Sequence, residues 1–482
     1  MLLILIPSSY FPLNIKYSLY FIFELCILKS YLHYLYFFLG VKYMNDLTKG
    51  NIYKQLIFLA IPLILGNILQ QFYNTIDSFI AGQWISQNAF SAIGTAGSIM
   101  NLFIFMINGC CNGVTIIFCQ YYGERNELGI KKEIFISLLV GFIFVGSLSL
   151  IGIFNLDLFL RLLATPLDIF YLVKKYLMII ICFLFVTFIY NWSSSVLRAF
   201  GDSKMALYIL GLSIGMNIIL DSIFVIGLHL GIQSLAFATI ISQFISSLFC
   251  TYYLVHRYSF ICFHFNEITN IKPLLKTTIH YGFISALHQS SLYLGKLLIQ
   301  GAINSAGMHI ITAYAITSRI EGFINSFGDS GCVAISIMVG QNYGGHHLER
   351  TKECFYKGLK LMMGFVVIFS IIMICLTQPM TLLFVDASQH LIIQETYHYM
   401  VTICLLYIFC FIGNAYVSFY RGIGRVDVPF KGTSMHVTIR IILSYLLIGR
   451  YGLAGVALAC GAGWIFVNIY QTIKYKKLDL SC

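Results

Sequence analysis

Long apolar runs, separated by short gaps with charged residues, glycine or proline, fill the sequence after Met44. A helix that crosses a lipid bilayer needs ~20 predominantly apolar residues, and each run reaches that length. The twelve predicted spans lie at about 51–82, 88–118, 132–155, 168–196, 203–227, 232–256, 273–302, 309–340, 354–376, 391–420, 427–449 and 452–473. Charged residues make up only 10% of the chain, whereas a soluble domain carries about 25%. The sequence therefore predicts an all-α membrane protein with twelve transmembrane helices.

Basic residues are distributed unevenly over the gaps between the spans. Of the 30 Lys and Arg residues, 21 fall in one set of loops and ends and 4 in the opposite set; the other 5 lie in the first 43 residues or within spans. Because cytoplasmic loops are enriched in Lys and Arg, both ends of the 44–482 segment are predicted to be cytoplasmic, in a multi-pass protein of the cell membrane. The net charge of +11 does not indicate nucleic-acid binding, because no basic run is interleaved with aromatic residues.

The first 43 residues fit this pattern poorly. They are rich in Phe, Tyr, Leu and Ile, but they lack the basic segment and small-residue cleavage site that flank the apolar core of a signal peptide. Residues 17–40 could form a further hydrophobic helix, or translation could begin at Met44. We expect the second, and we treat residues 1–45 as an N-terminal extension.

Short motifs recur about 220 residues apart, which predicts an internal duplication. Gln120–Gly123 (QYYG) recurs as Gln341–Gly344 (QNYG), and Arg198–Gly201 (RAFG) recurs as Arg421–Gly424 (RGIG). Each half holds six spans, so the halves keep one orientation and are predicted to be related by an axis along the membrane normal. We expect two pseudo-symmetric six-helix bundles around a central cavity, a design suited to alternating access. The predicted parts are an N-lobe at 46–257, a linker at 258–271, a C-lobe at 272–476 and a tail at 477–482.

Charged side chains within spans are costly, and each is therefore a candidate for function. The acids singled out are Asp77, Asp221, Glu321 and Asp329, and the bases are Lys296, Arg319 and Arg440. The first half thus holds acids without a base, whereas the second half holds both signs. Lys296 occupies the repeat position of Asp77, and we expect it to be neutralised by Glu321 or Asp329. On this hypothesis the charges of the second half neutralise one another, while the first half exchanges the coupling ion.

Polar residues accompany both acids of the first half. Asn67, Gln70, Asn74, Asp77 and Ser78 follow a helical repeat and are predicted to share one face of the first span, and Asn217 and Asp221 share a face of the fifth. Amides in a span can also serve as helix–helix contacts. The two carboxyls, however, have no basic partner nearby in sequence. Burial disfavours the ionised form of a carboxyl, so each could exchange a proton near neutral pH, or hold Na⁺ when ionised.

Pro62 interrupts the first span fifteen residues before Asp77. A proline inside a helix removes one backbone hydrogen bond and kinks or loosens the helix. A bendable helix that carries a titratable group could transmit ion binding, although such kinks are also common in membrane helices without this role.

Signatures of enzymes and metal centres are missing from the sequence. It holds no G-x-x-x-x-G-K-[ST] phosphate loop and no H-E-x-x-H motif. Its 14 cysteines lack C-x-x-C spacing, and its 12 histidines lack H-x-x-x-H spacing. We therefore predict neither an enzyme nor a metal centre, and no cofactor apart from a coupling ion, H⁺ or Na⁺.

Several motifs, taken in order, resemble those of the MATE family, the multidrug and toxic compound extrusion transporters. They are Ile61-Pro62, Asp77–Gly82 (DSFIAG), Gln120–Gly123, Arg198–Asp202 (RAFGD), Asn217-x-x-x-Asp221 and Gln341–Gly344. The resemblance covers about 46–475. It implies twelve helices in two six-helix lobes, and efflux of bulky, often cationic, compounds driven by H⁺ or Na⁺.

The resemblance also implies where the coupling ion binds. In archaeal and many bacterial members an N-lobe network holds the ion and the first helix bends at the proline matching Pro62. The matching network residues here are Asp77, Asn191, Asn217, Asp221 and Thr239. Another branch uses carboxylates in the seventh and tenth spans, and this chain offers Gln289 in the seventh. C-lobe coupling of that kind is therefore not expected, and the secondary candidates are Lys296, Glu321, Asp329 and Gln289.

These features together predict a secondary antiporter that exports organic, often cationic, compounds from the cytoplasm by alternating access. Its partners are predicted to be small organic substrates and the lipid bilayer, without nucleic acid or an obligate protein partner. The alternative is a lipid-linked oligosaccharide flippase of the same superfold. Such a protein would hold a pyrophosphate with cations such as Lys296, Arg319 and Arg440.

Overall fold

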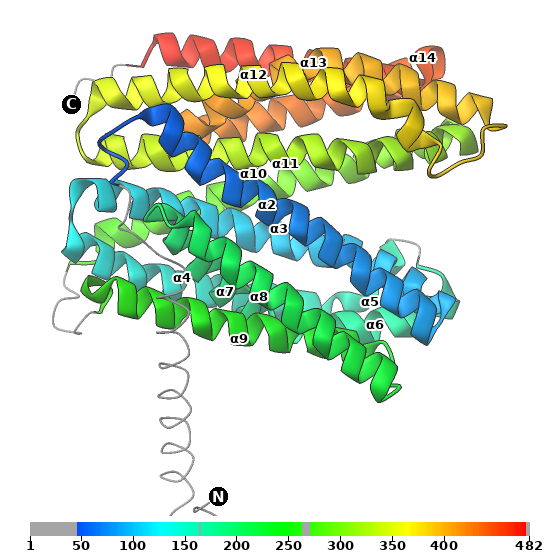
Figure 1. Ribbon diagram of the computed structural model, residues 1–482, viewed down its shortest axis with the longest axis horizontal. Coiled ribbons are helices and arrows are strands. Elements are labelled where there is room, and N and C mark those ends of the chain that lie inside the picture. Colours follow the sequence, from blue (N-terminus) through cyan, green and yellow to red (C-terminus); the bar gives the residue numbers. More distant parts are fainter. Residues whose placement is uncertain (1–45, 163–164, 263–269, 479–482) are drawn as a thin grey trace, which may run out of the picture. The chain divides into compact units, whose positions relative to one another are not determined.

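The computed structural model describes residues 46–162, 165–262 and 270–478, which fold almost entirely into helices (Figure 1). The first half contains α2 (Ile52–Ile80), η1 (Ala81–Ile85), α3 (Gln87–Glu124), α4 (Glu127–Phe154), α5 (Leu156–Leu162), α6 (Leu167–Cys182), α7 (Leu184–Ala199), α8 (Ser203–Asp221), η2 (Ser222–Gly227), α9 (Gln233–Arg257) and η3 (Ser259–Ile261). The second half contains α10 (Lys272–Ser305), α11 (Met308–Gly344), α12 (Leu348–Thr381), α13 (His390–Gly422) and α14 (Asp427–Lys476). The expectations for residues 1–45 lie outside the described residues.

The predicted spans correspond to these helices. Nine helices in the described ranges are long and apolar enough to cross a membrane, and the pair α6 and α7, bent by 52°, makes a tenth. α14 runs over 50 residues and contains two predicted spans, because Gly452 breaks its helical geometry. The remaining span is α10, which is 34 residues long and carries several Lys, His and Ser residues. The prediction of an all-α membrane protein is confirmed.

The break in α14 shows how one glycine ends one span and starts the next. Gly452 has φ 56° and ψ −143°, in a region that side-chain-bearing residues rarely adopt. The backbone N–H of Leu453, which follows the break, donates to Oε2 of Glu395 on α13 at 2.8 Å. Glu395 therefore satisfies a donor that the interrupted helix leaves without its usual partner.

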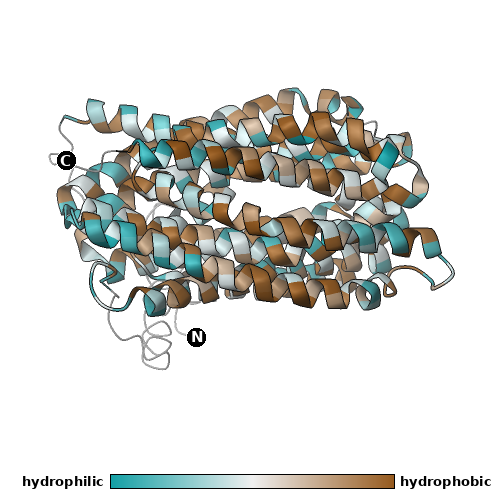
Figure 2. Cartoon of the chain, turned by 90° about the horizontal axis from the view of Figure 1, so that it is seen from above, coloured by the Kyte–Doolittle hydropathy of each residue, from teal (hydrophilic) through white to brown (hydrophobic). Residues whose placement is uncertain are grey.

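The helices form two bundles (Figure 1). α2 to α9 make up the N-lobe and α10 to α14 the C-lobe, and the lobes contact each other mainly through α3 against α10 and α11, and α2 against α11. Hydrophobic residues are concentrated along the middle of the helices, and hydrophilic residues toward their ends (Figure 2). Large exposed apolar side chains such as Phe142, Ile143 and Leu446 give the bundle a surface suited to lipid.

The two copies of the repeated motif meet where the lobes touch, at the end predicted to face the cytoplasm. Gln120 on α3 donates from Nε2 to the carbonyl oxygen of Gly422 at 2.9 Å. Gln341 on α11 donates to the carbonyl oxygen of Ala199 at 2.6 Å. Because Ala199 and Gly422 are themselves repeat equivalents, the two hydrogen bonds are a pseudo-symmetric pair. We call the closed contact of α3 and α4 with α10 and α11 at this end the seam.

Glycines allow the helix backbones to touch along the seam. A Cβ atom added at Gly123 would overlap the carbonyl oxygen of Gln341, and one at Gly344 would overlap that of Gln120. Gly109 lies so close to α10 that its Cβ would stand 2.6 Å from the Cα atom of Ala286. The lobes are thus packed backbone to backbone on this side.

Candidate ion-binding site

The two N-lobe aspartates occupy equivalent places at the ends of α2 and α8. Asp77 lies near the last turn of α2, which continues into η1, and Asp221 is the last residue of α8, which continues into η2. Both continuations are π-helical, a local widening that is frequent at functional sites. Asp77 is 7% exposed and Asp221 is 0% exposed. The chain therefore buries two carboxyl groups where its helices depart from regular geometry.

The two carboxyl groups face each other. Their side chains lie within hydrogen-bonding reach of each other, and two carboxyl groups can form such a bond only when a proton lies between them. Two like charges at this separation would repel strongly if both groups were ionised. The pair is therefore built to hold a shared proton, or a cation in its place.

Asn217 joins the two carboxyls to the backbone of α9. When its amide nitrogen faces the carboxyls, it donates to Oδ1 of Asp77 at 3.1 Å and to Oδ2 of Asp221 at 3.1 Å. Its amide oxygen then accepts from the backbone N–H of Thr239 at 3.2 Å. All three hydrogen-bonding groups of the amide are thus used, and Asn217 fixes the spacing of the pair.

A second group of polar side chains surrounds the pair. The hydroxyls of Tyr73 on α2 and Thr239 on α9 lie 3.0 Å apart, and Tyr73 also interacts electrostatically with Asp77. Tyr176 on α6 is buried and interacts electrostatically with both aspartates. The buried Oδ1 atom of Asp221 has no hydrogen-bond partner. Carboxylate and hydroxyl oxygens from three helices therefore meet at one buried point, a donor set that fits either H⁺ or the hard cation Na⁺.

The structure brings together four of the five predicted network residues. Asp77, Asn217, Asp221 and Thr239 are joined as described. Asn191 on α7 instead donates to the carbonyl oxygen of Thr187 in its own helix at 2.8 Å.

The polar face predicted for the first span is divided between two neighbours. Asn67 donates to Oγ of Ser330 on α11 at 3.1 Å, so it points to the C-lobe, whereas Asp77 points to α8. Ten residues of α-helix turn through nearly three full turns but end well away from the starting direction. The prediction of a single face is therefore wrong for Asn67, and Gln70 is exposed.

The expected neutralisation of Lys296 takes a different form in the structure. Lys296 makes no ion pair within the described ranges, although its charge acts on Asp329. Oε1 of Glu321 accepts hydrogen bonds from Tyr407 at 2.7 Å and Tyr399 at 3.1 Å. Of the two acids expected to neutralise Lys296, Asp329 is therefore the one on which its charge acts, whereas Glu321 is held by tyrosines. Gln289 is half-buried on α10.

Three residues near the site or the seam were not predicted from the sequence. Tyr73 precedes Asp77 by four residues, so the helical repeat could have found it. Tyr176 lies on another helix, and no spacing signals its approach. Glu133 falls within the predicted 132–155 span, and the structure buries its side chain completely at the seam.

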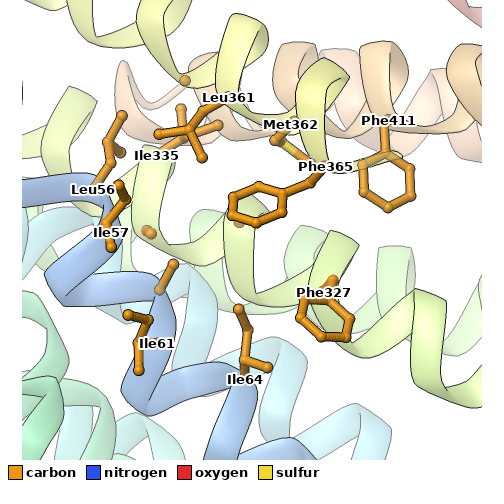
Figure 3. Close-up of a pocket in the computed structure, with 14 residues that line it drawn as sticks. Leu56, Ile57, Ile61, Ile64, Phe327, Ile335, Leu361, Met362, Phe365 and Phe411 are labelled. Carbon is orange, nitrogen blue, oxygen red and sulfur yellow. The ribbon is translucent and has the colours of Figure 1, made fainter. Parts of the chain in front are cut away.

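An apolar groove lies beside Pro62 between the lobes (Figure 3). It spans about 520 Å³ of space, part of which is open to the surroundings, and is lined by apolar side chains and glycine. Ile57, Ile61 and Ile64 of α2 face Phe327 of α11 and Phe365 of α12 across it (Figure 3). Pro62 is buried within α2. A change in the course of α2 at this proline would therefore alter the groove.

Sequence comparison assigns both halves of the chain to one family. The sequence model of the MatE family matches residues 62–223 and again residues 285–446, two segments displaced by the repeat spacing. The chain is 30% identical over 301 residues to the probable multidrug resistance protein YpnP of Bacillus subtilis, covering 62% of this chain and 67% of that protein. It is 24% identical over 433 residues to the probable multidrug resistance protein NorM of Thermotoga maritima, covering 86% of this chain and 90% of that one.

Solved structures share the fold. A structure described as the outward-facing conformation of a multidrug resistance MATE family transporter of the MOP superfamily superposes with a TM-score of 0.82 at 20% identity, over 92% of this chain and 100% of that one. The family match extends over most of the chain, and it covers the helices that carry Asp77, Asn217 and Asp221. The chain therefore belongs to the MatE family.

Proposed function

We propose that this chain is a secondary antiporter that exports organic, often cationic, compounds from the cytoplasm, coupled to H⁺ or Na⁺ at Asp77 and Asp221. The observation that carries the proposal is the buried carboxyl pair, whose side chains lie within hydrogen-bonding reach of each other and contact α9 through Asn217. The names of the relatives YpnP and NorM, both probable multidrug resistance proteins, support the substrate class. The two half-matches to the family support a two-lobed transporter.

In this mechanism the coupling ion controls how α2 packs against α8. With a proton or Na⁺ bound, the carboxyls of Asp77 and Asp221 attract each other through the shared ion. When the ion leaves, the two ionised carboxyl groups face each other without a positive charge between them, and their repulsion favours a separation of α2 from α8. Asn67 on the same helix contacts Ser330 of α11, so a movement of α2 also reaches the C-lobe.

Export is tested most simply in a bacterial host that lacks its own major drug exporters. Expression of the chain is expected to lower ethidium accumulation and to raise the minimal inhibitory concentration of ethidium. The Asp77→Asn variant, at equal abundance in the membrane, serves as the matched control and is expected to behave like the empty vector. If the accumulation of ethidium and of several other organic cations were unchanged, with the protein present in the membrane, the proposed substrate class would be contradicted.

Pro62→Ala is expected to slow export without removing ion binding. Alanine restores a backbone N–H that can complete the helical ladder of α2, and one hydrogen bond of about 1 kcal/mol shifts a bent-to-straight equilibrium by about fivefold. The measurement is the initial rate of ethidium efflux, with Pro379→Ala in α12 as the control for a proline inside another helix. An efflux rate equal to that of the unmodified protein in Pro62→Ala would exclude bending at this position from the transport cycle.

A further inference from the structure

Glu133 is a buried carboxyl group between the two lobes. It lies on α4, two turns from the start of that helix, and its side chain is 0% exposed. Its Oε2 atom lies 2.8 Å from Oγ1 of Thr278 on α10, so the contact crosses from the N-lobe to the C-lobe. Its Oε1 atom is buried and has no hydrogen-bond partner. The carboxyl is thus placed where the lobes are closed against each other.

Hydrogen-bond accounting indicates that this carboxyl is neutral. The hydroxyl of Thr278 has one proton but two neighbouring acceptors, Oε2 of Glu133 at 2.8 Å and the carbonyl oxygen of Leu274 at 2.9 Å. If Glu133 is ionised, either its carboxylate or the carbonyl of Leu274 must go without that proton. If Glu133 is protonated, its own O–H donates to Oγ1 of Thr278, which in turn donates to Leu274. Both short distances are satisfied only in the second arrangement.

Within the part of the chain that the structure describes, no cation pairs with Glu133, although Lys131 and Lys132 precede it on the same helix. From α3, Cys110 and Tyr121 interact with it electrostatically, and neither carries a positive charge. α10 presents the neutral Thr278. Among the described residues, the other elements packed against α4, which are α5, α6, α7 and η3, place no charged group that acts on the carboxyl. An unpaired ionised carboxylate in such a place is strongly unfavourable.

We propose that Glu133 is a proton-binding site of the seam: it holds a proton while the lobes are closed against each other, and releases it when the seam opens to water. The seam-closed state then binds one more proton than the seam-open state. Acidification therefore favours closure, and the ratio of open to closed seam rises by up to about tenfold per pH unit as the pH increases. This site lies apart from the Asp77 and Asp221 pair, and the proposal goes beyond ion coupling there.

The distance across the seam measures this directly. Spin labels are attached at Leu128 on α4 and Lys276 on α10, both exposed, in a variant without reactive cysteines. The distance between the two labels is measured by pulsed electron paramagnetic resonance between pH 5 and pH 9. In the unmodified protein, the distance between the labels is expected to change from short to long as the pH rises. Glu133→Gln, which imitates the protonated carboxyl, is expected to stay at the short distance throughout. Glu127→Gln, at an exposed acid of the same helix, is the matched control and should follow the unmodified seam.

Two further measurements keep the outcome clear. The same series in an Asp77→Asn, Asp221→Asn background is expected to retain the pH-dependent shift, which separates this proposal from ion coupling at the pair. Infrared spectra of protein with ¹³C-labelled glutamate should show a protonated carboxyl band at neutral pH, and this measurement does not need the Glu133→Gln variant to fold. The proposal would be overturned if the seam of the Glu133→Gln variant opened with the same pH dependence as that of the unmodified protein. It would also be overturned if no protonated glutamate band were seen.

Discussion

Asp221→Asn is expected to reduce ion-driven ethidium efflux by about 100-fold, the scale of a strong coupling free energy between two sites. Asparagine keeps the size of the side chain, but it cannot ionise, so the pair with Asp77 can no longer alternate between an attractive and a repulsive state. Asp221 is fully buried and hydrogen-bonded to Asn217, so its carboxyl is not in contact with bulk water. Asp77→Asn is expected to have the same effect, since both carboxyls are needed for one shared ion.

The control for this prediction lies in the C-lobe. Asp329→Asn removes an acid from a span without touching the pair and is expected to leave ion-driven efflux within about twofold of the unmodified rate, the margin typical of substitutions away from a coupled site. Efflux is measured in proteoliposomes with equal amounts of each variant. If efflux persisted in both N-lobe variants and disappeared in Asp329→Asn, the coupling site would have to be moved to the C-lobe.

Gly123→Ala is expected to reduce transport by at least several-fold, because it opposes closure of the seam. The added Cβ would overlap the carbonyl oxygen of Gln341, and backbone of the opposite lobe cannot move aside as a flexible side chain could. Overpacking of this kind costs about 1–3 kcal/mol, which reduces the closed population by about 5- to 150-fold. Within a helix, glycine to alanine otherwise stabilises by about 1 kcal/mol, so the protein is expected to fold and to remain open at the seam.

The seam prediction has matched controls in the same chain. Gly344→Ala should repeat the effect, because its Cβ would overlap the carbonyl oxygen of Gln120, whereas Gly146→Ala on α4 meets nothing within 4 Å and should transport normally. The readouts are ethidium efflux and the spin-label distance between α4 and α10. Normal efflux with an unchanged short distance in Gly123→Ala would show that the seam tolerates the extra atom.

The hydrophobic runs and the recurring motifs were sufficient to predict the helices and their grouping. Apolar length alone predicted the spans, and the spacing between Gln120–Gly123 and Gln341–Gly344 predicted the duplication that the family match repeats. The motifs themselves did not reveal that Gln120 and Gln341 bond across the lobes. That contact depends on the packing of α3 against α11, which no local pattern encodes.

The candidate site was predictable in part. Asn217 and Asp221 could be paired from their spacing, because they share one helix. The approach of Asp77 to Asp221 joins two helices that are distant in sequence, and here the family resemblance was required. The residues around Lys296 show the limit of charge counting, because Glu321 accepts hydrogen bonds from Tyr399 and Tyr407 and not from Lys296. Glu133 was missed because it lies near the end of a span, where an acid is expected to reach water.

Efflux under separately imposed ion gradients tests the central claim, that the buried carboxyl pair couples an ion to export. Proteoliposomes loaded with ethidium are given either a proton gradient or a sodium gradient, and unmodified protein is compared with the Asp77→Asn, Asp221→Asn double variant. Efflux driven by one of the gradients in the unmodified protein, and lost in the double variant, is the predicted result and identifies the ion. Equal gradient-driven efflux in both proteins would contradict the account.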